Sequence, residues 1–107
     1  MKPDLEALIL GALREGPMHG YGIVRKIRGD SEVLKAGEGQ LYPVLHRMES
    51  DGLVDGSWEI QDGRPPRKLY TLTEKGSGQL ERKRKEFKEF RAAVESLLGV
   101  DGLGSQS

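Results

Sequence analysis

The sequence predicts a mainly α-helical protein with one small β-hairpin and a long carboxy-terminal helix. Three observations support this fold class. Apolar residues recur every three or four positions in residues 3–14, 18–28 and 39–50, which is the period of an amphipathic helix. Over residues 53–72 the period changes to about two, as in strands. The helical period then returns over the much longer stretch 73–98.

The composition limits the class of protein. The chain has 107 residues, with 17 basic and 17 acidic side chains and therefore no formal net charge. This length predicts one domain, or a small domain with an appendage. Neutrality disfavours a general nucleic-acid coat protein but leaves site-specific binding open.

Metals, cofactors and membranes are not expected. Cysteine is absent and the two histidines lie far apart in the sequence, so we predict no disulfide, no metal site and no cofactor. No apolar run approaches the roughly 20 residues of a membrane span, and no signal-peptide pattern is present. We therefore expect a cytoplasmic protein.

The first helix is predicted over residues 3–14. Its apolar residues form one stripe at helical spacing, namely Leu5, Leu8, Ile9, Ala12 and Leu13. Pro3 and Asp4 suit the first turn of a helix. Gly16 and Pro17 are expected to end it.

A second helix is predicted to open in residues 18–22. Its apolar set includes Ile23, Val24 and Ile27, with Arg25, Lys26 and Arg28 on or beside its solvent side. The glycines and proline before it make a tight corner, so the two helices should pack across each other. His19 lies at the start, where its ring could cap backbone amides, contact a phosphate, or simply lie on the surface.

Residues 39–52 predict a short helix with two different faces. Leu41, Val44, Leu45 and Met48 gather on one side, and Gly39, Pro43, His46, Arg47 and Ser50 on the other. Because proline lacks an amide hydrogen, Pro43 predicts a helix start near residues 39–42, and Gly52 should end the helix. The amides at the helix start can bind an outside acceptor such as phosphate. We interpret this segment as a recognition helix; the alternative is an ordinary amphipathic core helix.

The next segment predicts a hairpin with a loop of about six residues in the stretch 61–67. Apart from Gly56, one face of its strands is apolar, with the inward positions Val54, Trp58, Ile60, Tyr70 and Leu72. The loop carries two arginines and two prolines. A stiff, basic tip suits a DNA backbone or narrow minor groove. The alternative is a solvated loop.

The last helix is predicted to run from an N-cap at Thr73 to Leu98, with Gly99 closing it. At 1.5 Å per residue it would extend about 39 Å, too long for the preceding body to cover completely. Its apolar residues follow a heptad-like pattern, which favours contact with a second copy. The predicted domains are a DNA-binding domain over residues 1–72, a dimerisation helix over residues 73–99 and a flexible tail over residues 100–107.

Three helices, a two-stranded wing and a long terminal helix predict a winged helix-turn-helix protein, and the motifs resemble the PadR family. These motifs are His19-Gly20-Tyr21, Gly39-Gln40-Leu41-Tyr42-Pro43-Val44-Leu45-His46-Arg47-Met48-Glu49, Gly52-Leu53-Val54, Gly63-Arg64 with Arg67-Lys68, and Tyr70-Thr71-Leu72-Thr73. The resemblance covers about residues 3–98. It implies a homodimeric bacterial transcription regulator, usually a repressor, whose terminal helix forms the dimer, and it is closest to the compact subgroup with a single such helix. Gln40, Met48 and Leu69 depart from the family's usual residues, and an amide at Gln40 can read adenine.

We therefore predict a sequence-specific DNA-binding regulator that binds a palindromic operator as a homodimer. The predicted DNA-binding residues are His19, Tyr21, Gln40, Tyr42, Pro43, His46, Arg47, Arg64, Arg67 and Lys68. The predicted dimerisation residues are Leu80, Phe87, Phe90, Val94 and Leu97. Leu8, Phe87 and Phe90 could hold a small apolar or planar effector, or could be plain dimer core.

The alternative function is a winged-helix module that binds protein without direct DNA binding, which the zero net charge favours. Such a module should present an apolar face, whereas the outward face here carries Gln40, His46, Arg47 and Ser50. An enzyme is not expected. The sequence has no cysteine, no glycine-rich phosphate loop after a strand, and no histidine with an obvious carboxylate partner.

Overall fold

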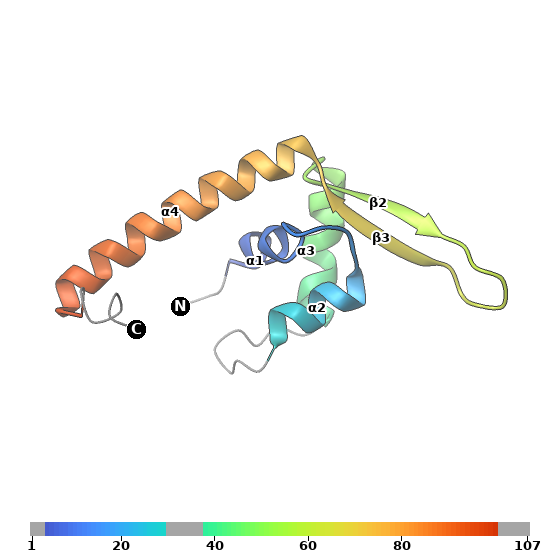
Figure 1. Cartoon of the computed structure of the whole chain (residues 1–107), viewed down its shortest axis with the longest axis horizontal. Coiled ribbons are helices and arrows are strands. Elements are labelled where there is room, and N and C mark those ends of the chain that lie inside the picture. The colour runs from blue at the N-terminus through green and yellow to red at the C-terminus, as the bar shows by residue number, and fades with distance from the viewer. Residues whose placement is uncertain (1–3, 30–37, 101–107) are drawn as a thin grey trace.

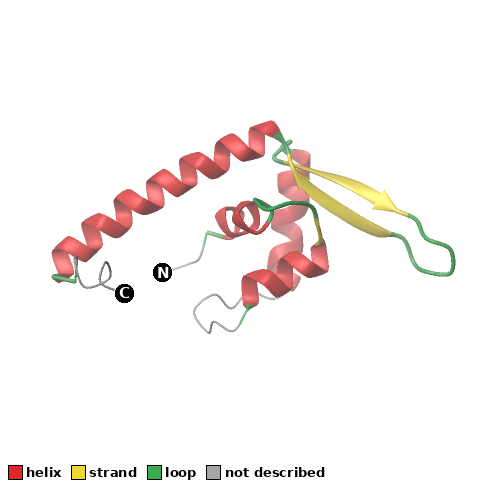
Figure 2. Ribbon diagram, in the orientation of Figure 1, coloured by secondary structure: helices red, strands yellow, loops and turns green. Residues whose placement is uncertain are grey.

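A computed structural model describes residues 4–29 and 38–100 (Figure 1). The elements in order are α1 (Leu5–Ala12), β1 (Met18–His19), α2 (Gly20–Arg28), α3 (Glu38–Ser50), β2 (Val54–Glu59), β3 (Arg67–Leu72) and α4 (Glu74–Leu98). Figure 2 shows α1, α2 and α3 grouped together, with the β2–β3 hairpin projecting to one side and α4 to the other. The predicted fold class is confirmed. Pro3 and the predicted tail after residue 100 lie outside the described residues.

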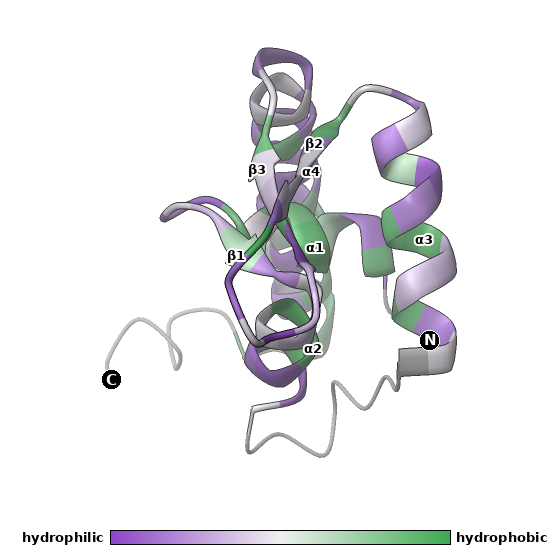
Figure 3. Ribbon diagram, turned by 90° about the vertical axis from the view of Figure 1, so that its right-hand side faces the viewer, coloured by the Kyte–Doolittle hydropathy of each residue, from purple (hydrophilic) through white to green (hydrophobic). Residues whose placement is uncertain are grey.

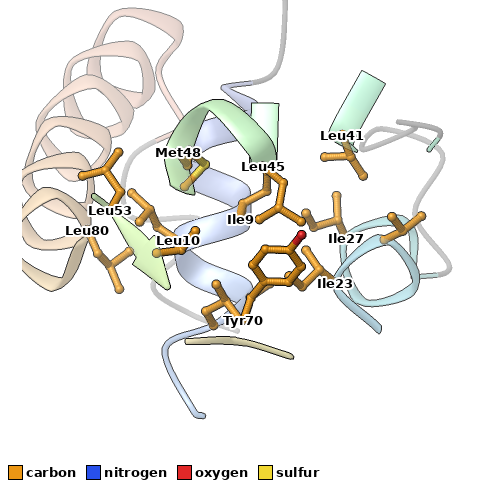
Figure 4. Packing of buried hydrophobic residues seen from close by; sticks show 14 residues of the cluster. Ile9, Leu10, Ile23, Ile27, Leu41, Leu45, Met48, Leu53, Tyr70 and Leu80 are labelled. Atoms are coloured by element: carbon orange, nitrogen blue, oxygen red, sulfur yellow. The ribbon is translucent and has the colours of Figure 1, made fainter. Parts of the chain in front are cut away.

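One hydrophobic core joins the three short helices to the base of the sheet and the start of α4 (Figure 4). The predicted inward face of α3 is confirmed, because Leu41, Leu45 and Met48 are buried and Val44 is half-buried. In α1 the predicted stripe is also part of this core or packs against it. Leu10, which the stripe leaves out, is fully buried as well.

A short strand that the sequence did not predict precedes α2. Met18 and His19 were expected in the second helix, but they form β1, which pairs antiparallel with β3 in a sheet of order β1-β3-β2. Met18 lies opposite Tyr70 and His19 opposite Leu69. That prediction was wrong because two residues paired with a strand some fifty positions away leave no local periodicity.

Helix α3 begins at Glu38, earlier than predicted, so Pro43 lies inside the helix and not in its first turn. The carbonyl that Pro43 cannot bond is that of Gly39, four residues earlier and exposed at the helix start. The end of α3 is as predicted. Gly52 has a φ of 76°, and the amide of Leu53 donates to the carbonyl of Met48 at 2.9 Å, which is a left-handed glycine cap.

Strands β2 and β3 form the predicted hairpin, in register from Val54 opposite Leu72 to Glu59 opposite Arg67. The connection spans residues 60–66, seven positions and not six. Near the helices, the inward prediction holds for buried Val54 and Tyr70. It is wrong for Trp58 and Ile60, which are 64% and 80% exposed because the hairpin continues beyond the helices (Figure 1).

The start of α4 is tied to the body. Thr73 is the predicted N-cap: its Oγ1 accepts from the amide of Gly76 at 3.0 Å and donates to the carbonyl of Gly52 at 2.6 Å. A side chain at Gly76 would collide with the carbonyl of Leu53, so glycine permits this close approach. Leu80 follows within the core. It was predicted to form the dimer, but the structure places it inside its own protomer.

The rest of α4 extends beyond the core that is formed by the three short helices and the base of the sheet. Phe87, Phe90 and Leu97 are 60%, 51% and 88% exposed. The radius of gyration is 16.2 Å, against about 13 Å for a compact domain of this length. Within the described residues, no helix is both long enough and apolar enough to cross a membrane.

Candidate nucleic-acid interface

The start of α2, the middle of α3 and the two long strands converge on one pocket of about 360 Å³. Figure 3 looks from the hairpin end, with α3 on one side and α2 below. The pocket is lined by His19, Gly20, Tyr21, Tyr42, His46, Trp58, Arg67, Lys68 and Tyr70. Six of the ten predicted DNA-binding residues are therefore brought together. Trp58 was expected in the core, and Tyr70 contributes from the core edge.

Close packing of α2 on α3 positions the aromatic side chains of this pocket. A Cβ at Gly20 would lie 2.7 Å from Cε1 of Tyr42, so only glycine lets the Tyr42 ring reach the start of α2. The rings of Tyr42 and His46 lie 6.2 Å apart. Tyr21 is 59% exposed, with the Arg25 guanidinium 5.5 Å from its ring centre. The pocket thus presents hydroxyl, imidazole and cationic groups together.

His19 occupies the N-cap position of α2, but its side chain makes no capping hydrogen bond. Its Nε2 instead lies 2.6 Å from Oε1 of Glu59, at the end of β2. The capping role was therefore wrong, and this histidine does have a carboxylate partner. The pair joins residues 40 positions apart, so nothing in the local sequence indicated it.

Lys68 was predicted to contact a phosphate, but the structure places its ammonium in an ion pair. Its Nζ lies 2.7 Å from Oε1 of Glu49, in the last turn of α3. The hydrogen bond that the Lys68 ammonium donates to Glu49 raises the pKa of Lys68 above its ordinary value, against the opposing effect of desolvation. Burial raises the pKa of the neighbouring Tyr70. Both groups keep their protons at neutral pH.

The outward face of α3 carries Gln40, Pro43 and His46, all exposed as predicted. All three lie in the first two-thirds of the helix. Ser50 is exposed at the other end.

Arg47, also predicted to meet bases, is directed toward acidic groups. Its guanidinium lies 3.3 Å from Glu6 and 3.5 Å from Asp51. Glu6 is only 14% exposed, and its other oxygen accepts from Gln79 at 3.0 Å and lies 3.7 Å from Lys83. One carboxylate of α1 therefore joins the end of α3 to α4.

The wing tip is polar and exposed. Arg64 and Arg67 are exposed, as are Pro65 and Pro66 between them. Gly63 makes the turn with a φ of 75°. Both arginines are placed where a molecule lying along the wing would meet them.

A second, open groove of about 450 Å³ lies between α1 and α4. Leu8, Leu80 and Phe87 contribute apolar surface to it, and Phe90 is not among its lining residues. The basic side chains that line it are Arg14, Lys83, Arg84, Lys88 and Arg91. The predicted effector slot thus keeps Leu8 and Phe87 side by side.

The helix-turn-helix of α2 and α3, together with the β2–β3 wing beside it, defines a winged helix-turn-helix protein. More narrowly, the chain belongs to the PadR-like transcriptional regulator family, whose sequence profile matches residues 9–82. This is a family of regulators and not of enzymes.

Two related proteins are also transcriptional regulators. The chain is 32% identical over 77 residues to the negative transcriptional regulator PadR of Bacillus subtilis, covering 71% of this chain but only 42% of that protein. It is 30% identical over 86 residues to the transcriptional regulator Rv3488 of Mycobacterium tuberculosis, covering 80% and 78%.

Solved structures show the same fold. A PadR family regulator from hypervirulent Clostridium difficile matches with a TM-score of 0.80 at 31% identity, covering 90% of this chain and 99% of that one. Bacillus subtilis PadR in complex with operator DNA matches with a TM-score of 0.67 at 31% identity, covering 76% and 46%. The chain therefore spans slightly less than half the length of that DNA-bound relative.

Proposed function

We propose that this chain is a sequence-specific DNA-binding repressor that acts in the cytoplasm as a homodimer on a palindromic operator. The observation that carries the proposal is the convergence of α2, α3 and the wing on one surface of aromatic, imidazole and cationic side chains. A helix presenting exposed Gln40, Pro43 and His46 suits the major groove, where side chains read base edges. The Bacillus subtilis relative supports the repressor role, since it is a negative regulator and has been crystallised with operator DNA.

We infer that Gln40 and Pro43 lie nearest bases, whereas Tyr21, Tyr42 and the arginines Arg64 and Arg67 contact the phosphate backbone. Backbone contacts set register and orientation but carry no sequence information directly.

Dimerisation through the distal half of α4 is supported by its exposed apolar side chains. We propose that Phe87, Phe90, Val94 and Leu97 form the seam, without Leu80. A two-fold axis along this seam would present two copies of α3 to half-sites about one helical turn apart, roughly 10 base pairs.

The proposal is tested by gel shift with duplexes from the promoter of the chain's own operon, against a scrambled duplex of equal length. We expect preferential binding of one promoter duplex that weakens as salt rises, because phosphate contacts release counterions. A chain that binds neither duplex at low salt would instead favour the protein-interaction module.

The wing contact is tested within the same assay. Replacing Arg64 with alanine should flatten the slope of log affinity against log salt by about one unit, on specific and scrambled DNA alike. The control is Lys88→Ala, which removes an equal charge from α4, away from this surface. Equal slopes for Arg64→Ala and the wild-type chain would remove the wing from the interface.

A further inference from the structure

The ion pair between Lys68 and Glu49 joins the wing to the recognition helix. Lys68 belongs to β3 and Glu49 to the last turn of α3, and their side chains are only 24% and 29% exposed. An ammonium held by a carboxylate at 2.7 Å and partly withdrawn from water is poorly placed to serve as a mobile phosphate contact.

The sheet is built around this pair. In the register of the hairpin, Lys68 lies opposite Trp58, and Tyr70 lies opposite Gly56 on the same face. The Lys68 Nζ is 5.5 Å from the centre of the Trp58 ring and 5.7 Å from that of Tyr70, within the range of cation–π attraction. Three groups therefore fix the ammonium: one carboxylate and two rings.

Gly56 explains why the pair can form. A Cβ at this position would collide with Cε of Lys68 and would lie 2.9 Å from Oε2 of Glu49. The glycine that interrupts the apolar alternation of β2 thus leaves the space through which Glu49 reaches Lys68.

A side-chain contact joins the same wing to the start of the other helix of the helix-turn-helix. Nε2 of His19, at the N-cap of α2, lies at hydrogen-bond distance from Glu59 at the end of β2. A side-chain pair therefore connects the wing to each helix of the helix-turn-helix, in addition to the pairing of β1 with β3 at the base of the wing. The part of the hairpin beyond β1 is two-stranded and has little stability of its own, so its direction depends on such connections.

We propose that Glu49 and Lys68 are positioning residues that set the angle between the recognition helix and the wing, and that Lys68 does not itself contact DNA. This inference rests on the proposed DNA-binding function. Its consequence is that an acidic residue near the DNA-facing surface favours binding, although its charge alone would repel phosphate.

The test measures operator affinity over a salt series, by fluorescence anisotropy, for Glu49→Gln, Lys68→Met and the double variant. We expect each single change to weaken binding by roughly three- to thirty-fold, with the salt slope unchanged. The double variant should bind no worse than either single variant, because one shared interaction is lost. Lys68→Arg keeps the charge that pairs with Glu49 and should therefore retain more of the affinity than Lys68→Met.

The matched control is Arg67→Met, on the same strand and one residue away, which should reduce the slope by about one unit. Hydroxyl-radical footprints provide a reading that a loss of folding would not give. In the Glu49 and Lys68 variants, protection under the wing should be lost while protection under α3 persists, with thermal unfolding showing that the chain is still folded.

Either of two results would overturn this inference and leave the proposed function standing. The first is a salt slope reduced by one unit in Lys68→Met together with unchanged or tighter binding in Glu49→Gln. The second is wild-type affinity and wild-type footprints in both single variants. If the wild-type chain binds no promoter duplex at all, the proposed function fails and this inference fails with it.

Discussion

At the scale of single residues, the clearest candidate for reading sequence is Gln40. Its side chain is exposed near the start of α3, and an amide can bond adenine through two hydrogen bonds. We expect Gln40→Ala to reduce discrimination against one base pair of the operator by about 1 to 3 kcal/mol, while discrimination at other positions is retained. Competition binding with single-base-pair variants measures this. Ser50→Ala, at the other end of the same helix, is the control, and equal base preferences in all three chains would exclude Gln40 from readout.

Arg47 was predicted to lie near bases, on the outward face of α3. In the structure its guanidinium is engaged by Glu6 and Asp51. Asp51 is a local partner, four residues further along the chain, whereas the contact with Glu6 joins residues 41 positions apart and could not be predicted from the sequence.

A second prediction concerns the stability that Asp4 contributes and how it changes with pH. Partial burial alone would raise the pKa of Asp4, but hydrogen bonds from the Lys83 ammonium and the Ala7 amide hold it below the ordinary value of 3.8. A carboxyl group with a lowered folded-state pKa stabilises the protein above its unfolded pKa, and this contribution is lost as the pH falls through the folded pKa.

Asp4→Asn isolates that charge, because asparagine caps a helix as well as aspartate does. We expect the variant to be less stable than the wild-type chain at pH 7 and the difference to close at acid pH. Urea midpoints at intervals from about pH 7 to about pH 2.5 would show this convergence. If the urea midpoints of the two chains differed by the same amount at every pH, the ion pair between Asp4 and Lys83 would not contribute to the stability of the fold.

At the scale of elements, the distal half of α4 is the part whose role can be tested most directly. Phe90 is half exposed and follows Phe87 by three residues, so both lie on one side of the helix. We expect Phe90→Glu to convert a dimer into a monomer, because a carboxylate in an apolar seam stays unpaired. Analytical ultracentrifugation at micromolar concentration is the measurement. Lys85→Glu, on the opposite side by helical spacing, should remain dimeric, and a monomeric wild-type chain would refute the seam.

Helices were predictable from the sequence to within a few residues because their apolar spacing and caps are local. The Thr73 cap, the Gly52 and Gly99 ends and the buried face of α3 needed no distant information. Strand β1 and the exposed half of the wing were not predictable. The first depends on pairing with a far segment, and the second depends on where the supporting helices end.

The candidate interface was half predictable for the same reason. Motif residues at the start of α2 and along α3 do gather on one surface. Glu59, Glu6 and Glu49, which engage His19, Arg47 and Lys68, come from three other elements, and only packing brings them near. The sequence therefore did not show which of these side chains already have an acidic partner.

At the scale of the whole molecule, the groove between α1 and α4 connects the proposed dimer to the proposed DNA surface. Glu6 of α1 contacts both α4 and the end of α3, so a shift of α4 would change the contact between Glu6 and Arg47. A ligand alters DNA affinity only to the extent that it binds one arrangement better than the other.

We expect an apolar or planar molecule with an acidic group, such as a phenolic acid, to bind this groove and to weaken operator affinity by roughly 5- to 150-fold. Five basic side chains line the groove around Leu8 and Phe87, and an acidic group would compete there with the carboxylates that already pair with Lys83, Arg84 and Arg91. Calorimetry with and without operator DNA tests this, with planar cations as the comparison set. Phe87→Ala should abolish binding, and a ligand that binds without changing operator affinity would exclude control through this groove.

The length of α4 beyond the body has a consequence for its dynamics. Isolated helices of some twelve residues are barely stable in water, so the turns after Phe87 depend on whatever covers them. In the proposed dimer the partner helix covers these turns, and dilution removes the partner by mass action. The backbone amides of this half should then exchange with deuterium faster on dilution, while those of the core around Ile9 and Met48 keep their protection.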